Sequence, residues 1–250
     1  MANYIRRILL STITIVLIAA SIAIAATPIE VGVPDIVTAQ IVQFIGGAYI
    51  NVTTRRSKMR TAPHIIALDK LHYIPHTSRR RGNATTAQVH FLLPEEKHDA
   101  ESLLSDPATL PYIAELVANT LSEVLPTRRT YLQRRLGEFN SQLRSLLITG
   151  RKSLKGTKIL CASKYLEPFM RAFGAEIRVV TPDEARAIAE ATGAQPAGND
   201  KWSIILDWKA DARIRSALAG RAVVLEPDGG DLLRSIYIAI LELRPKTMRN

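Results

Sequence analysis

The sequence predicts an α/β protein of two lobes with mainly parallel sheets, joined by a long connecting helix. Two observations predict this fold. Short β-rich runs alternate with amphipathic helical segments in both parts of the chain, and one apolar stripe at helical spacing separates the two parts. The chain has 250 residues, of which 47% are hydrophobic and 22% charged, and this composition excludes a disordered chain and a multi-span membrane protein.

Residues 1–26 predict export from the cytoplasm. Arg6 and Arg7 form a basic start, no charged residue follows up to Ala26, and Ala23-Ile24-Ala25 has the small-x-small pattern of a signal-peptidase site. The run also approaches the roughly 20 apolar residues that cross a bilayer, so a retained membrane anchor is the alternative to a cleaved signal peptide. Both interpretations place the rest of the chain outside the cytoplasm.

Residues 27–127 are predicted to form the first lobe. Residues 28–33 predict a strand, Asp35 caps a helix that ends at Gly46-Gly47, and residues 49–53 predict a second strand. Strand, helix and strand in this order form a βαβ unit, which implies a parallel sheet. Residues 54–106 give no clear pattern and contain all five histidines. A further helix begins at Asp106-Pro107 and ends before Pro126.

The connecting helix is predicted within residues 128–154. Leu132, Leu136, Phe139, Leu143 and Leu146 recur at steps of three and four, which places them in one stripe on a helix. Arginines lie on the other side of the same helix.

Residues 155–250 are predicted to form the second lobe, in which strands and helices alternate. This alternation again predicts a parallel sheet. The predicted strands are Lys158–Ala162, Glu176–Val180, Trp202–Leu206 and Ala222–Leu225; the predicted helices are Tyr165–Phe173, Pro182–Thr192, Ala210–Leu218 and Leu232–Leu243.

Charge and cysteine content exclude several classes of function. The net charge is +10, but the basic runs are short and lack interleaved aromatic residues, so we expect a solvated basic surface and no nucleic-acid partner. The single cysteine, Cys161, excludes a disulfide framework and a cysteine-rich metal site, and its position in a strand predicts a buried side chain. No nucleophile–base motif or phosphate-binding glycine loop is present, so we expect no enzyme.

Several local strings carry a resemblance to a known family. They are Pro34-Asp35-Ile36-Val37, Ile45-Gly46-Gly47, Pro63-His64, Asp106-Pro107, residues 131–146 and residues 158–174. In this order and spacing the chain resembles the zinc/manganese substrate-binding proteins of ABC importers, as a diverged member. The similarity covers most of residues 28–245.

The resemblance implies a metal site, and the chain departs from it at two positions. His64 matches the first ligand. The second falls near Ser102, for which His90 or His98 could substitute, and the third falls at Ser163, two residues from Cys161. Asp228 matches the fourth ligand, with Glu226 and Asp231 as alternatives. We expect His64 in a loop at a strand end, facing Asp228 of the other lobe.

The resemblance therefore implies an extracytoplasmic, monomeric receptor that captures zinc or manganese between its lobes and delivers it to an ABC permease in the membrane. The alternative is a membrane-tethered accessory or interaction protein that keeps the receptor fold and binds no metal.

Overall fold

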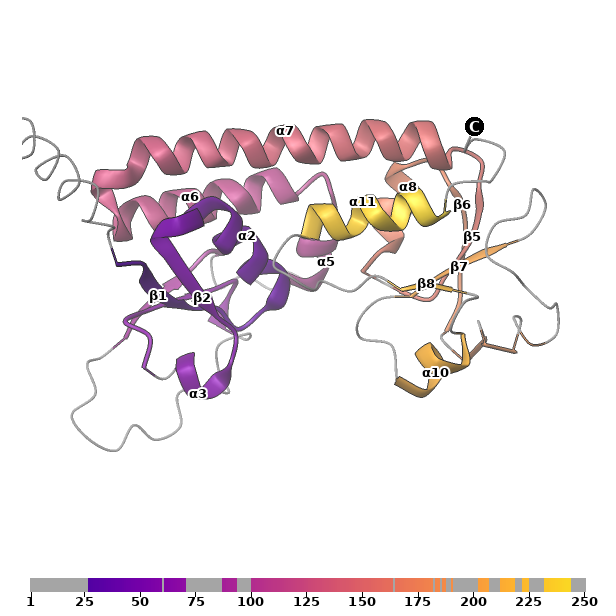
Figure 1. The fold of residues 1–250 in the computed structure, drawn as a ribbon, viewed down its shortest axis with the longest axis horizontal. Helices are drawn as coiled ribbons and strands as arrows, with labels where there is room; N and C mark the ends of the chain where they lie inside the picture. The colour runs from indigo at the N-terminus through magenta and orange to yellow at the C-terminus, as the bar shows by residue number, and fades with distance from the viewer. Residues whose placement is uncertain are drawn as a thin grey trace, which may run out of the picture.

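The computed structural model contains two four-stranded sheets, each with all its strand pairs parallel, and a long helix that runs past both (Figure 1). The structure describes residues 27–59, 61–70, 87–93, 100–163, 165–181, 183–184, 186–187, 190, 202–206, 212–218, 222–224 and 232–243. The predicted fold class, two α/β lobes joined by a long helix, is confirmed. The predicted signal peptide or anchor, residues 1–26, lies outside the described residues.

The first sheet has the strand order β2-β1-β3-β4. Its strands are β1 (Ile29–Gly32), β2 (Ile50–Thr53), β3 (His64–Ala67) and β4 (Gln88–Phe91). Helix α2 (Ile36–Gly46) connects β1 to β2 and is capped as predicted, because the Asp35 carboxylate accepts a hydrogen bond of 2.8 Å from the Thr38 N–H. A short 3₁₀ turn, η1 (Gly47–Tyr49), leads from α2 into β2.

Helices cover both faces of the first sheet. Val31 and Ile66 belong to a core that α2 shares with α6 (Leu110–Val124). On the other face the one-turn helix α3 (Arg56–Met59) packs against β1, and the Met59 side chain comes within 3.0 Å of the position that a Cβ on Gly32 would take. Helix α5 (Ala100–Ser105) precedes α6. Thus β3, β4, α3 and α5 occupy the part of the chain where no clear pattern was found.

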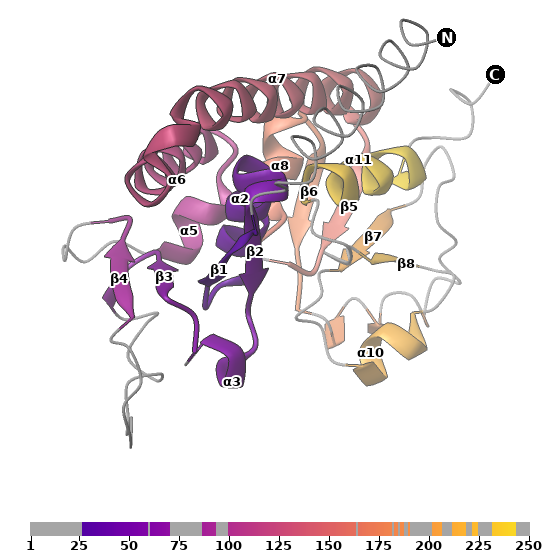
Figure 2. The same cartoon turned by 60° about the vertical axis from the view of Figure 1, so that its left-hand side comes forward.

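The connecting helix is α7 (Arg129–Leu154), which follows the 3₁₀ turn η3 (Pro126–Arg128). It packs against α2 and α6 of the first lobe and against α8 (Glu167–Ala172) and α11 (Leu232–Leu243) of the second. In Figures 1 and 2 it runs along the top of the labelled elements, and the strands of both sheets lie below it.

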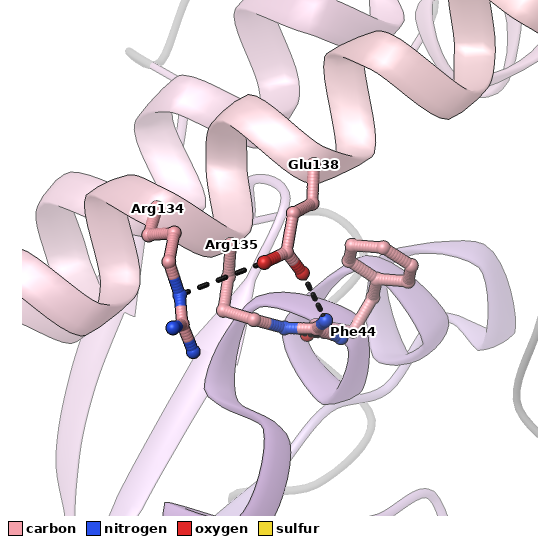
Figure 3. A network of polar contacts seen from close by, with 4 residues as sticks. All are labelled: Phe44, Arg134, Arg135 and Glu138. Atoms are coloured by element: carbon pink, nitrogen blue, oxygen red, sulfur yellow. Dashed lines mark hydrogen bonds and ion pairs between the residues drawn. The ribbon is translucent and has the colours of Figure 1, made fainter.

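Arg135 fixes α7 to the end of α2 (Figure 3). Its guanidinium donates two hydrogen bonds to the Phe44 carbonyl, at 2.9 and 2.7 Å, and lies over the Phe44 ring. Glu138 pairs with both Arg134 and Arg135 from one turn further along the helix. The Glu138 carboxylate therefore compensates the positive charge of Arg135 within the same helix.

The second sheet has the strand order β6-β5-β7-β8. Its strands are β5 (Lys158–Cys161), β6 (Glu176–Val179), β7 (Ser203–Leu206) and β8 (Ala222–Val224). Ile159, Cys161 and Ile205 face the core shared with α7, α8 and α11, whereas Leu160 and Ile204 face a smaller cluster that includes Leu218, next to α10 (Ala212–Ala217). Cys161 is buried, as predicted. Strands β5 to β8 lie within their predicted ranges, and α11 has its predicted bounds.

One hydrophobic core extends through both lobes. It contains Val42 and Leu121 from the first lobe, Leu146 from α7, and Phe169 and Ile236 from the second. Helix α11 contributes to this continuity because it contacts α2 as well as α7. Among the described residues, no helix combines the length and the apolar character needed to cross a membrane.

Candidate functional site

The candidate site is the region at the carboxyl edges of the two sheets. In a parallel sheet all strands end at the same edge, and ligands of open α/β sheets bind there. In the first lobe, Asp35 follows β1 and Asp69 follows β3; in the second lobe, Ser163 and Tyr165 follow β5. These residues lie within four positions of the ends of their strands.

Tyr165 joins the two lobes at this edge. Its hydroxyl donates a hydrogen bond of 2.9 Å to the Leu104 carbonyl in α5, and its side chain is buried. Burial, with a smaller contribution from the negative charge of Asp35, raises the pKa of the Tyr165 hydroxyl well above its usual 10.0.

Ser163 lies at the third ligand position that the resemblance implies, and its hydroxyl is hydrogen-bonded to the backbone. The Ser163 Oγ accepts a hydrogen bond of 3.1 Å from the Leu166 N–H, and the side chain is 3% exposed. The nearby Cys161 thiol donates to the Ser163 carbonyl at 3.2 Å. Both groups thus stabilise the turn between β5 and α8.

His64 does not lie where it was expected. The expectation that it occupies a loop at the end of a strand is wrong, because His64 is the first residue of β3 and is aligned with Val31 in the middle of the sheet. At about 3.3 Å per residue, its Cα lies roughly 10 Å from the carboxyl end of β3 at Ala67. The short helix α3 and β3 take up the stretch in which a ligand loop was expected.

The structure brings His64 and His90 together. His90 in β4 is aligned with Ile66, so the two histidines lie two positions apart on the same face of adjacent strands. Their ring centroids are 5.8 Å apart and the rings are tilted by 35°. Both are half-buried, on the face of the sheet that carries Val31 and Ile66, which belong to the core shared with α2 and α6.

Burial is the main cause of a lowered pKa of His90. It lowers the pKa of His90 below 6.5; the neighbouring His64 lowers this pKa further, and Glu123 opposes the change. The His64 Nδ1 and His90 Nε2 atoms are buried, and no hydrogen-bond partner for them is found within the described part of the chain. The geometry thus favours the uncharged form of His90.

The other predicted ligands, His98 and Asp228, lie outside the described residues, as do Glu226, Asp231 and the side chain of Ser102. Within the ranges that the structure describes, no group of three His, Cys, Asp or Glu side chains could hold a metal ion. The described part of the edge supplies the carboxylates of Asp35 and Asp69.

Sequence reasoning missed Tyr165, which was assigned only to the start of a helix. Its position four residues after a buried strand was the available signal, since residues at the carboxyl edge of a parallel sheet commonly form the site.

No family model matches the sequence, and no curated protein matches it. Solved structures do match the fold. The periplasmic zinc-binding protein TroA from Treponema pallidum has 15% identity and a TM-score of 0.57, with 87% of this chain and 98% of that chain covered. ZnuA has 13% identity and a TM-score of 0.58, covering 86% and 98%.

The zinc-bound ZnuA-like domain of AdcA from Streptococcus pneumoniae is a third neighbour, at 10% identity and a TM-score of 0.55, with 86% of this chain and 97% of that domain covered. In each case the shared fold extends over nearly the whole neighbour. The chain therefore has the two-lobe α/β fold of periplasmic metal-binding proteins.

Proposed function

We propose that this chain is a diverged extracytoplasmic solute-binding protein of an ABC importer, which captures zinc or manganese between its lobes and delivers the ion to the membrane permease. The observation that carries the proposal is the two-lobe fold shared with TroA and with the zinc-bound ZnuA-like domain over 86–87% of the chain. We expect a monomer, no nucleic-acid partner, and a location outside the cytoplasm directed by residues 1–26.

His98 and Asp228 are the proposed ligands, one from each lobe. In the sequence His98 follows the end of β4 by seven residues, and Asp228 follows the end of β8 by four. Segments that follow parallel strands start at the carboxyl edge, which supports these two residues over His64. Imidazole nitrogen and carboxylate oxygen both bind zinc, while manganese prefers more oxygen ligands.

Glu226 and Asp231 flank Asp228 in the sequence and are the proposed sources of further oxygen ligands. We leave His64 and His90 out of this ion site, because they lie on the face of the sheet that carries Val31 and Ile66, away from its carboxyl edge. Ligands from both lobes would make ion capture favour the closed arrangement of the lobes, which is the form that a permease could recognise.

Thermal melting of the full chain with zinc or manganese tests this proposal. Ligation to the folded state raises the melting midpoint with increasing ion concentration, so we expect a rise for at least one ion. His98→Ala and Asp228→Ala should each abolish the rise, whereas the control His90→Gln should keep it, whatever its own midpoint. A flat response of the folded wild-type protein to both ions would instead favour an accessory protein that binds no metal.

A further inference from the structure

Helix α5 depends on neighbouring elements for its position. It has six residues, Ala100–Ser105, and a helix of this length is not stable on its own in water. Its main contacts are with α6 of the first lobe and with α8 of the second. The last carbonyls of a helix have no hydrogen-bond partner within the helix, so the end of α5 needs donors from outside. Those donors therefore help to fix where α5 lies.

Two successive carbonyls near the end of α5 accept hydrogen bonds from different lobes. The Thr109 hydroxyl, in the turn before α6, donates to the Leu103 carbonyl. The next carbonyl along the helix, that of Leu104, accepts the hydrogen bond of 2.9 Å from the Tyr165 hydroxyl. One donor thus belongs to the first lobe and the other to the second, so α5 is held at the boundary between the lobes.

Tyr165 is itself held by the turn that follows β5. The Leu166 N–H donates to the Ser163 hydroxyl at 3.1 Å, and this hydrogen bond closes the turn that contains Tyr165. The Tyr165 side chain is 8% exposed, and its burial raises the pKa of the hydroxyl well above 10.0. The hydroxyl therefore keeps its proton at neutral pH and remains a hydrogen-bond donor to α5.

Helix α5 is also close in sequence to the proposed ion site. It begins two residues after His98, the ligand proposed from the first lobe. Tyr165 lies four residues after the end of β5, at the carboxyl edge of the second sheet. The ligands of a metal ion keep their geometry only when the groups that support them are fixed. A shift of α5 relative to the second lobe would therefore move the point at which the segment with His98 joins the helix.

We propose that Tyr165 is a positioning residue for the ion site, because its hydrogen bond to the Leu104 carbonyl fixes α5, and with it the attachment of the first-lobe ligand, against the second lobe. This inference rests on the proposed function, since it concerns the site at which that function places the ion. Tyr165 acts without touching the ion. It increases the affinity by presetting the relative position of the two ligand-bearing segments.

The dissociation constants of the folded full chain for zinc and manganese test this role. They are measured by competition with a fluorescent chelator of each ion, at a temperature at which every variant is folded. Tyr165→Phe keeps the ring and removes the hydroxyl, and we expect it to weaken binding about tenfold, as loss of a group that orients a metal ligand commonly does. A residue with a purely structural role would lower the free energy of unfolding and leave the dissociation constant of the folded protein unchanged.

Two controls separate positioning from stability. Tyr112→Phe makes the same chemical change at an exposed tyrosine of α6. Ile45→Val removes one buried methylene near the end of α2, at the amino edge of the first sheet, and destabilises the fold away from α5. Both should keep the wild-type dissociation constants. Unchanged constants in Tyr165→Phe, or an equal loss in Ile45→Val, would overturn the positioning role and leave the proposed function standing, whereas wild-type protein that binds neither ion would overturn both.

Discussion

Histidine is a residue type that suggests metal binding, but His64 and His90 lie side by side in a half-buried environment on one face of the first sheet. Both rings lie on one face of β3 and β4, and burial makes the protonated form of His90 costly. The lowered pKa of His90 means that the folded protein binds fewer protons than the unfolded chain between that pKa and 6.5.

The free energy of unfolding should therefore contain a contribution from His90 that is fully present above pH 6.5 and decreases as the pH falls through the lowered pKa. We predict that His90→Gln reduces the loss of stability between about pH 7.5 and about pH 5. Urea unfolding of both proteins at several pH values measures this difference. Identical pH dependence in the two proteins would show that His90 is not desolvated as the structure indicates.

Tyr165 is the residue that links the carboxyl edges of the lobes. Tyr165→Phe keeps the ring and removes the donor to the Leu104 carbonyl, which is buried between α5 and Tyr165. We predict a loss of about 1–2 kcal/mol in the free energy of unfolding, because a buried acceptor is left without this donor. The control Tyr112→Phe, at a side chain that is 52% exposed, should change stability by less than about 0.5 kcal/mol. Equal effects of the two variants would contradict the role of Tyr165.

At the scale of elements, the position of α7 depends on a close approach to α8. A Cβ on Gly150 would collide with the Phe173 ring at the end of α8, whereas a Cβ on Gly137 would meet nothing within 4 Å. Both glycines lie in the same helix, so they differ in packing and not in helical context.

We predict opposite effects of alanine at these two glycines. Gly150→Ala should destabilise the protein by about 1–3 kcal/mol through overpacking against Phe173. Gly137→Ala should stabilise it by up to about 1 kcal/mol, because alanine has the higher helix propensity. Denaturant unfolding of both variants measures whether the two changes in the free energy of unfolding have opposite signs. Stabilisation by Gly150→Ala would mean that α7 and α8 are further apart than described.

Elements with periodic patterns could be predicted from the sequence. The stripe of α7, the Asp35 cap of α2 and the bounds of α11 depend on local spacing, which the sequence contains. Strand β3 could not be predicted in this way. A short strand buried on both faces is a continuous apolar run without period, and α3 before it has a single turn.

The position of His64 could not be predicted, because His64 is part of β3. Whether Pro63-His64 belongs to a loop or begins a strand depends on the register of β3 against β1, which is set by long-range pairing. The contact between His64 and His90 depends on the register of β3 against β4, which is also set by long-range pairing, since the residues are 26 positions apart in the sequence. The candidate site could be predicted only to the level of the sheet edge at which it lies.

At the scale of the whole molecule, the two lobes share one core and one long helix. Buried residues of α2, α6, α7, α8 and α11 form one continuous cluster, so the lobes are coupled by packing as well as by Tyr165. The proposed function requires that an ion bridges the carboxyl edges of the two sheets, within this coupled frame.

The central claim is that one divalent ion is held by ligands from both lobes. Anomalous X-ray scattering at the zinc edge, from crystals of the chain grown with zinc, tests it most directly. We predict one strong anomalous peak between the lobes, within about 2.0–2.2 Å of a His98 nitrogen and an Asp228 oxygen. A peak at His64 and His90 with none between the lobes, or no peak at saturating zinc, would contradict the claim.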